Sequence, residues 1–281
     1  MRQQTFVNGK PTLYLVATPI GNLSEFTPRA IEVLKSVSVI ACEDTRTSKT
    51  LLDHFQIDTK VMAYHKFNEK ESVGKFISYL NEGNDIALIS DAGYPLVSDP
   101  GNVLVDEVLS RGFNVTTISG SSAFLNALVA SGFSLERFTF VGFLDSKSSA
   151  RKRELEGLKN NKETLIFYES PHRIKEFLED LLLVFGDRRV TLARELTKKF
   201  EEFIRNNISE ILKIVDTLKG EMVVIVEGNK EQKETIEEAK LVQEIAELSR
   251  KYSNKEVVKI LVDKYDLKKN YVYDLVCKNK W

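Results

Sequence analysis

Residues Ser90–Gly101 read SDAGYPLVSDPG and follow directly on the apolar run Asp85–Ile89, DIALI. The run is typical of a buried strand. The loop after it holds two each of Asp, Gly, Pro and Ser, so it has a set shape that lets a ligand approach the backbone closely. Ligands of open α/β sheets bind beyond the carboxyl ends of strands, where this loop would lie. The alternative is an ordinary turn, in which Asp99 caps the next helix and Pro100 is its first residue.

Strand-like and helix-like segments alternate on both sides of this loop. In the first part of the chain, strands are expected at 12–17, 39–42, 60–64, 85–89 and 114–118. Helices are expected between them, at 28–37, 47–55, 68–82 and up to residue 110. This alternation predicts an N-terminal α/β domain over residues 1–118, with a largely parallel, doubly wound sheet.

A second α/β set follows, which predicts a second α/β domain over residues 119–229 with a parallel or mixed sheet. Its strands are expected at 138–143, 165–168, 190–193 and 223–226. The helical pattern is clearest at 174–185, and residues 146–162 form a polar, basic segment.

The composition changes after Gly228. Three short helices are expected at 236–252, 254–265 and 269–278, so residues 230–281 are predicted to form a small C-terminal helical domain. From Arg250 to Trp281 there are nine Lys or Arg against four Asp or Glu. The unit is therefore either a solvated helical cap or an appendage that touches RNA.

The composition of the 281 residues is that of a globular protein, with 42% hydrophobic and 29% charged residues. The net charge of -1 provides no global attraction to nucleic acid, so any such binding needs a local patch. Cys42 and Cys277 form neither a disulfide framework nor a zinc spacing. The polar start MRQQTFVNGK is not a signal peptide, and no apolar run approaches about 18 residues, so a cytoplasmic protein with no membrane span is expected.

Several familiar motifs are missing from the sequence. It has no G-x-G-x-x-G after the first predicted strand and no G-x-x-x-x-G-K-[ST]. It also has no H-E-x-x-H, no Cys/His cluster and no G-x-S-x-G. The sequence therefore points away from dinucleotide enzymes, P-loop NTPases and zinc or serine hydrolases, and no metal is expected.

Six polar clusters instead follow predicted strands. They are TPIGN (18–22), CEDTR (42–46), SDAGYPLVSDPG (90–101), SGSSA (119–123), YESPHR (168–173) and ARELTK (193–198). Each alone has a simple structural explanation, such as surface ion pairs or a capped helix start, although a helix start could equally bind a phosphate or carboxylate. Six clusters at the ligand-binding edges of two sheets indicate a cleft between two domains.

Five of the six clusters, all except SGSSA, belong to longer motifs that resemble one family, the bacterial ribosomal RNA small subunit methyltransferase I family of class III, tetrapyrrole-methylase-like enzymes. The motifs are LYLVATPIGNLSEFTPRAIEVL (13–34), ACEDTRTSKTLL (41–52), ALISDAGYPLVSDPG (87–101), FVGF (140–143), FYESPHRI (167–174) and ARELTKKFEE (193–202). They are long and in the family's order, and the match runs from about residue 12 to 228. The tail also resembles the family's small helical domain.

The resemblance implies an S-adenosylmethionine-dependent 2'-O-methyltransferase that acts on a cytidine ribose in the decoding centre of 16S rRNA, in the small ribosomal subunit. It also implies two α/β domains with the cofactor in the cleft between them, and a homodimer. Two positions depart from the family's pattern: Ser119 stands where Pro is usual, and Tyr94 stands where Thr is common. Ser119 loosens a turn slightly, and Tyr94 changes side-chain contacts but not backbone contacts.

The resemblance also places candidate site residues. The cofactor is expected along two loops and, by family analogy, at two strand ends, which gives Asp91, Ala92, Gly93, Tyr94, Pro95, Ser98, Ser121, Ser122, Ala123, Tyr168 and Ala193. A ribose hydroxyl is a weak nucleophile, so a base or a nearby cation should help it lose its proton. The catalytic candidates are Glu43, Asp44, Glu169 and Glu195, with Glu69, Asp91 and Arg194 as further acid/base or orienting candidates. The candidates to hold RNA phosphates are Arg46, His172, Arg173 and Lys198.

Two other functions stay open. A class III methyltransferase acting on a tetrapyrrole or a protein side chain would keep the cofactor and change the substrate. The EDTR, SPHR and RELTK clusters and the tail favour the ribosomal branch instead. A non-catalytic RNA-binding or ribosome-assembly protein on the same fold would bind no S-adenosylmethionine, and the intact polar clusters argue against it.

Overall fold

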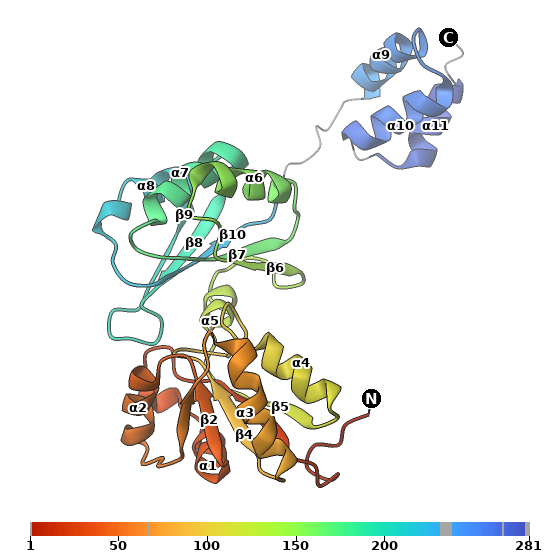
Figure 1. Cartoon of the computed structure of the whole chain (residues 1–281). Helices are drawn as coiled ribbons and strands as arrows, with labels where there is room; N and C mark the ends of the chain where they lie inside the picture. Colours follow the sequence, from red (N-terminus) through yellow and green to blue (C-terminus); the bar gives the residue numbers. More distant parts are fainter. Residues whose placement is uncertain (1, 67, 231–237, 266, 279–281) are drawn as a thin grey trace. The chain divides into compact units, whose positions relative to one another are not determined.

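The computed structural model describes residues 2–66, 68–230, 238–265 and 267–278, which form two compact units, Met1–Gly228 and Asn229–Trp281. The larger unit holds two β-sheets with helices on their faces, and the smaller unit is helical (Figure 1). This architecture confirms the predicted α/β fold class. The division of the larger unit at residue 118 stays a prediction.

The first sheet is entirely parallel and has the strand order β3-β2-β4-β1-β5. Parallel neighbours need crossover connections, which the intervening helices supply. The strands are β1 (Thr12–Val16), β2 (Val39–Cys42), β3 (Val61–Ala63), β4 (Ile86–Ile89) and β5 (Asn114–Ile118).

Helices cover both faces of this sheet. The helices α3 (Glu69–Asn81) and α4 (Asn102–Ser110) pack on one face, and α1 (Pro28–Ser36) and α2 (Thr45–His54) pack on the other. A strand buried on both faces needs apolar side chains at successive positions. This is why β4 reads IALI, with all four residues buried.

Capping side chains set the starts of α1 and α2. The Thr27 hydroxyl accepts a hydrogen bond from the backbone N–H of Ala30 at 3.2 Å, and α1 begins with a proline. The Asp44 carboxylate accepts from the backbone N–H of Arg46 at 2.8 Å. Because Asp44 is the cap, α2 begins at Thr45, two residues before the expected start.

The second sheet is mixed and has the strand order β6-β7-β10-β8-β9. The β6–β7 pair is parallel and the other three pairs are antiparallel. The strands are β6 (Phe138–Gly142), β7 (Thr164–Glu169), β8 (Arg189–Arg194), β9 (Glu202–Asn207) and β10 (Met222–Val226).

The two faces of the second sheet are covered unequally. Three helices, α6 (Ser148–Leu158), α7 (Ile174–Phe185) and α8 (Ile208–Leu212), contribute to the core on one face. The short helix α5 (Ala123–Val129) packs on the other face. The helix that follows the SGSSA turn therefore packs against the second sheet.

The elements β9, α6 and α8 were not expected from the sequence, in which residues 146–162 were described only as a polar, basic segment. The strand β9 reads EFIRNN, none of its residues is buried, and it pairs only with β8 at the sheet edge. An edge strand is covered on fewer sides, so the hydrophobic alternation that reveals a strand is weak there. Two short 3₁₀ helices, η1 (Leu23–Glu25) and η2 (Val215–Thr217), were also not expected.

The smaller unit consists of α9 (Glu238–Ser249), α10 (Asn254–Tyr265) and α11 (Lys269–Lys278), which pack around an apolar core of their own. Residues 236 and 237, predicted to start the first of these helices, lie outside the described residues. Within the described ranges, no helix combines the length and the apolar character that crossing a membrane requires.

Candidate active site

A cavity of about 430 Å³ lies at the carboxyl edge of the first sheet, inside the larger unit. One wall is formed by the segments after β1, β2 and β4 and by the start of α5. The facing wall comes from the ends of β6, β7 and β8 and from the start of β10. The cavity is therefore a cleft between the two sheets, a common place for a ligand in α/β proteins.

The loop Ser90–Gly101 forms much of the first wall and is pinned near its start. Gly93 and Thr18 exchange two backbone hydrogen bonds, of 2.9 and 3.0 Å. The Tyr94 hydroxyl accepts a hydrogen bond from the backbone N–H of Gly120 at 3.1 Å. These bonds join the loop to the segments that follow β1 and β5, so the three loops form one surface.

Glu69, at the start of α3, holds the far end of this loop. Its Oε1 accepts hydrogen bonds from the backbone N–H of Gly101 at 3.0 Å and from the Tyr64 hydroxyl at 3.2 Å. Gly101 precedes α4 and has a φ of +143°, so the helix begins later than expected. The alternative of an ordinary turn, in which Asp99 caps this helix and Pro100 is its first residue, is therefore wrong, because the cap is Gly101 and α4 begins at Asn102. Glu69 does not line the cavity, and its carboxylate instead holds the end of the loop Ser90–Gly101 in place.

Strained backbone gathers in two loops at the cavity. Leu96 and Ser98 have φ of +71° and +69°, and Glu195 and Thr197, after β8, have φ of +51° and +67°. These are four of the five non-glycine residues with positive φ among the described residues. A left-handed conformation costs such a residue roughly 1 kcal/mol or more, and such residues cluster at binding and active sites. The two loops are therefore candidates for a ligand site.

Carboxylates dominate the charge of the first wall, where Glu43, Asp91 and Asp99 line the cavity. Burial raises the pKa of Asp99 to about 6, and the charges of Glu43 and Asp91 add to this rise, while a hydrogen bond from Ser90 opposes it. Burial also raises the pKa of Asp91. Crowded carboxylates favour a positively charged ligand. Among the described residues, no group of three or more His, Cys, Asp or Glu is placed to hold a metal ion.

Tyr168, at the end of β7, gives the facing wall an aromatic surface. Its ring centroid lies 5.2 Å from that of Phe140 and 5.3 Å from that of Phe143. Burial raises the pKa of the Tyr168 hydroxyl to about 12, so it stays protonated at neutral pH. Phe143 also lines the cavity, and 57% of its surface is exposed. This surface suits stacking of a planar ring.

A second cavity, of about 500 Å³, adjoins the first, because Glu43 and Asp91 line both. Asp44 lies in its wall and accepts hydrogen bonds from Nε and Nη2 of Arg46 at 3.3 and 3.0 Å. These bonds lower the pKa of Asp44 to about 2. Asp44 is therefore a permanent anion that orients the Arg46 side chain, which is 90% exposed.

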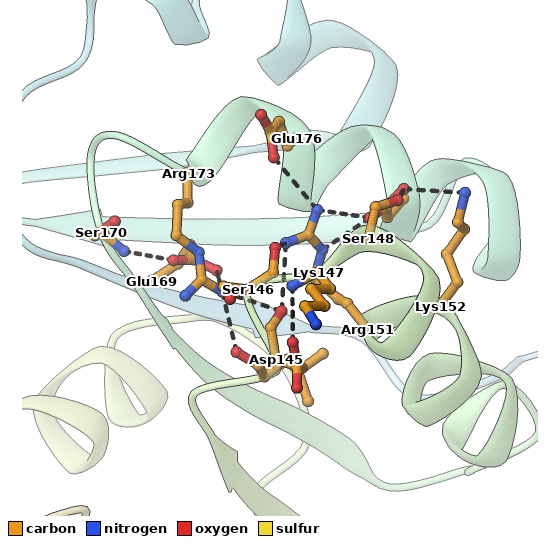
Figure 2. Close-up of polar contacts among 12 residues, drawn as sticks. Asp145, Ser146, Lys147, Ser148, Arg151, Lys152, Glu169, Ser170, Arg173 and Glu176 are labelled. Carbon is orange, nitrogen blue, oxygen red and sulfur yellow. Dashed lines mark hydrogen bonds and ion pairs between the residues drawn. The ribbon is translucent and has the colours of Figure 1, made fainter.

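At the facing wall of the first cavity, Arg173 and Glu169 form an ion pair (Figure 2). The Arg173 Nη2 lies 3.1 Å from Glu169 Oε2 and donates to the backbone carbonyl of Leu144 at 3.0 Å. The other oxygen of Glu169 accepts from the backbone N–H of Ser170 at 2.8 Å. The Glu169 side chain is only 1% exposed. Both predicted site residues thus fix the segment that follows Phe143.

Arg151, in α6, anchors the same segment from the other side. Its side chain is fully buried, its Nε donates to Asp180 at 2.8 Å, and its Nη1 donates to the Ser146 carbonyl at 3.2 Å. Asp180 lies in α7, and its side chain is 11% exposed. The pair therefore joins α6, α7 and the segment between β6 and α6.

Most of the predicted cofactor-binding residues meet at the first cavity. Those that line it are Asp91, Ala92, Gly93, Tyr94, Ser98, Ser122, Ala123 and Tyr168. Pro95, Ser121 and Ala193 do not line it. The Ser121 hydroxyl donates to Glu25 at 2.7 Å, and Ala193 is fully buried in the second sheet.

The predicted catalytic carboxylates are divided between the two cavities. Glu43, Glu169 and Glu195 line the first, and Asp44 lines the second. Glu195 Oε1 lies 3.1 Å from Lys198 Nζ. Arg194, a further candidate, pairs instead with Glu202 at 2.5 Å and lies outside the cavity lining.

The predicted phosphate-binding residues do not form one patch. Lys198 lines the first cavity, and Arg46 lines the second. His172 is exposed and lines neither of the two cavities. Arg173 is engaged in the interior contacts described above, which leaves it less suited to a phosphate than the other three.

Sequence reasoning missed the apolar part of the cavity, which includes Ile20, Val97, Phe143, Leu196 and Met222. A signal was present for four of them. Ile20, Val97 and Leu196 are apolar residues inside the polar clusters TPIGN, SDAGYPLVSDPG and ARELTK, and Phe143 ends the motif FVGF. Met222 had no such signal, because it comes from the start of β10, which no motif marks.

Comparisons with known proteins agree with this architecture. The family model described as Tetrapyrrole (Corrin/Porphyrin) Methylases matches residues 12–212. The protein named Ribosomal RNA small subunit methyltransferase I from Bacillus subtilis (strain 168) is 43% identical over 285 residues, which cover 98% of both chains. Proteins of that name from Halalkalibacterium halodurans and Escherichia coli O157:H7 are 52% and 41% identical, covering 80% and 97% of this chain and 78% and 96% of theirs.

Two solved structures show the same fold. A cobalt precorrin-4 methyltransferase is similar with a TM-score of 0.57 and 17% identity, covering 77% of this chain and 94% of that one. A diphthine synthase is similar with a TM-score of 0.60 and 12% identity, covering 78% and 90%. At such low identity the likeness shows the fold alone.

Proposed function

Because this chain belongs to the ribosomal RNA small subunit methyltransferase I family, within the tetrapyrrole (corrin/porphyrin) methylases, we propose that it methylates the ribose 2'-hydroxyl of a cytidine in the decoding centre of bacterial 16S rRNA. The methyl donor in this proposal is S-adenosylmethionine. The observation that carries the proposal is the identity to relatives of that name along nearly the whole chain, which includes every motif that builds the cavity.

The first cavity fits S-adenosylmethionine in size and in chemistry. Its volume of about 430 Å³ lies within the usual range of sites for small ligands. The sulfonium and ammonium groups of the donor are cations, and Glu43, Asp91 and Asp99 supply negative charge. The adenine is a planar ring, and Phe143 and Tyr168 supply aromatic surfaces.

The residues of this chain would position the reactants and accept a proton. When bound, S-adenosylmethionine supplies a methyl group on a positively charged sulfur. The ribose hydroxyl would lose its proton as its oxygen bonds to the methyl carbon and the carbon–sulfur bond of the donor breaks, with S-adenosylhomocysteine as the leaving group, so an acceptor close to both reactants is required. Glu43 and Asp91 line both cavities and are the carboxylates best placed for this role. Much of the rate gain is expected to come from alignment of the reacting atoms.

The experiment that tests this function is a map of ribose methylation on 16S rRNA. A strain with the gene deleted should lack one 2'-O-methyl group in the decoding centre, and restoring the gene should restore it. The alternative, a class III enzyme for a tetrapyrrole or other non-RNA substrate, is tested in parallel with methyl-transfer assays on small molecules. Transfer to a small molecule, with none to small ribosomal subunits, would favour the alternative.

The affinity for S-adenosylmethionine is expected to rise about three- to tenfold between pH 5 and pH 7.5. The pKa of Asp99 is about 6, so its carboxyl is mostly neutral at the lower pH and mostly ionised at the higher. Only the ionised form attracts a sulfonium. The groups that act on Asp99 are Glu43, Asp91 and the Ser90 hydroxyl, and Tyr168 lies near enough for its own pKa to respond to Asp99. Isothermal titration calorimetry across this pH range measures the rise.

Two controls isolate Asp99 in this measurement. The Asp99→Asn variant should bind with little dependence on pH, because the amide does not ionise. S-adenosylhomocysteine, which lacks the charge on sulfur, should show a smaller rise on the wild-type protein. An equal rise for both ligands, retained in the variant, would remove Asp99 from the cofactor site.

We further propose that the enzyme acts in the cytoplasm as a homodimer, as the family resemblance implies. Leu125 and Val129 on α5 are 46% and 64% exposed, which supports a partner surface at this helix. Sedimentation equilibrium of the full chain tests the dimer. A single species at the mass of one chain would contradict it.

A further inference from the structure

The second cavity lies beside the proposed cofactor site along one edge of the first sheet. Its lining comes from the segments that follow β2, β3 and β4, which are neighbours in the strand order. The first cavity lies over the adjacent stretch of the same edge, after β4 and β1. Because Glu43 and Asp91 belong to both linings, a group in one cavity can meet a group in the other at these two carboxylates.

The second cavity combines cations with hydrogen-bond acceptors. Arg46, Lys66 and His65 bring positive or proton-donating groups, and the carboxylates of Glu43, Asp44 and Asp91 bring acceptors. Arg46 and Lys66 are exposed. Asp44 binds two nitrogens of Arg46 and so sets the direction of its guanidinium.

A ribonucleotide matches this combination. Its phosphates need cations, and arginine and lysine are the side chains that most often supply them. Its sugar hydroxyls donate hydrogen bonds, and the exocyclic amino group of cytosine donates to Asp or Glu. A volume of about 500 Å³ has room for one nucleotide that is unstacked from its neighbours, as enzymes that act on a base require of their substrate.

We propose that the second cavity is the subsite for the target nucleotide, with Arg46 and Lys66 at its flanking phosphates and the shared carboxylates at its ribose. The assignment rests on the proposed function and adds His65 and Lys66 to the residues that contact RNA. In this arrangement the ribose lies at the border of the two cavities, and the base and phosphates lie beyond β3 and β2.

The test measures binding of small ribosomal subunits to the protein without S-adenosylmethionine, at several salt concentrations. The subunits come from a strain that lacks the gene, so that their target is unmethylated. Lys66→Ala and Arg46→Ala should each weaken binding about five- to tenfold. Each should also reduce the steepness of log affinity against log salt by about 0.7, the value for one phosphate contact on single-stranded nucleic acid.

Lys35→Ala is the matched control. Lys35 is an exposed lysine at the end of α1, which leads to the amino end of β2, whereas the two cavities lie at the carboxyl ends of the strands. Its loss should therefore change neither the affinity for the subunits nor its salt dependence. All variants should bind S-adenosylmethionine as the wild type does, which shows that the first cavity is intact. Suppose that the wild type methylates the subunits, but that Lys66→Ala and Arg46→Ala show the same slope of log affinity against log salt as Lys35→Ala. The assignment of the second cavity as the nucleotide subsite would then be wrong. If the wild type transfers no methyl group, the proposed function fails, and the subsite with it.

Discussion

Replacing Asp180 with alanine is expected to lower the free energy of unfolding by about 3–5 kcal/mol. The substitution leaves the guanidinium of Arg151 fully buried without its nearest carboxylate, whose Oδ2 lies 2.7 Å from Nη2. Glu176, the other carboxylate near Arg151, is 3.7 Å away and mostly exposed, so it offsets little of the loss. Urea unfolding followed by circular dichroism measures the change.

The exposed ion pair of Lys175 and Asp216 is the matched control. Their side chains are 51% and 71% exposed, and the pair spans 2.9 Å. Asp216→Ala should lower the free energy of unfolding far less than Asp180→Ala does, because water already screens and solvates both groups of this pair. The Asp180→Asn variant should fall between the two alanine variants, since the amide oxygen still accepts a hydrogen bond from Arg151. Equal losses for Asp180→Ala and Asp216→Ala would show that burial of Arg151 does not set the cost.

The buried pair of Arg151 and Asp180 also affects the proposed cofactor site, through the segment that follows Phe143. Arg151 donates a hydrogen bond to the Ser146 carbonyl (Figure 2). Arg173 donates one to the Leu144 carbonyl, so this segment is held at two points. Losing one of them should let Phe143 move at the cavity wall. Under conditions where it remains folded, Asp180→Ala is therefore expected to bind S-adenosylmethionine more weakly than Asp216→Ala does.

Asp91→Ala is expected to weaken binding of S-adenosylmethionine at least about tenfold at pH 8. A hydrogen bond that involves a charged group contributes about 1.5–3 kcal/mol, and about 1.4 kcal/mol corresponds to a tenfold change. Asp91 lines the first cavity from the loop after β4. Burial raises the pKa of Asp91, which means that its charged form is poorly solvated, and a cationic ligand would stabilise that form. Isothermal titration calorimetry measures the affinity.

Two further variants separate charge from shape at Asp91. Asp91→Asn keeps the size of the side chain and removes its charge, so it should lose nearly as much affinity as Asp91→Ala if charge is the cause. Asp106 is an exposed aspartate on α4 that does not line the cavity, and Asp106→Ala should bind as the wild type does. Wild-type affinity in Asp91→Ala would place the cofactor away from the loop Ser90–Gly101.

Much of the fold could be predicted from short stretches of sequence. The run IALI before the loop indicates a strand buried on both faces, and Thr27 before Pro28 indicates where α1 starts. These signals are local, because burial on both faces and helix capping each leave a pattern within a few residues. The edge strand β9 left no such pattern and was missed.

The candidate site was only partly predictable, since similar clusters of polar residues have different uses in the structure. Arg46 lies in the wall of a cavity, whereas Arg173 is engaged by Glu169 and a backbone carbonyl. Glu43 lines two cavities, whereas Glu69 fixes the start of α4. In the sequence, each of these residues is a charged side chain at or near the end of a strand.

By itself, the sequence of Ser90–Gly101 determined that a shaped loop follows a buried strand, because glycine, proline and apolar runs act on the backbone next to them. Only the tertiary structure decided what that loop faces. The strand order places β3, β2 and β4 side by side and brings the second sheet opposite, so Asp91 lies between two cavities. Strand order and charge pairing depend on contacts between residues far apart in the chain, and such contacts leave no local pattern.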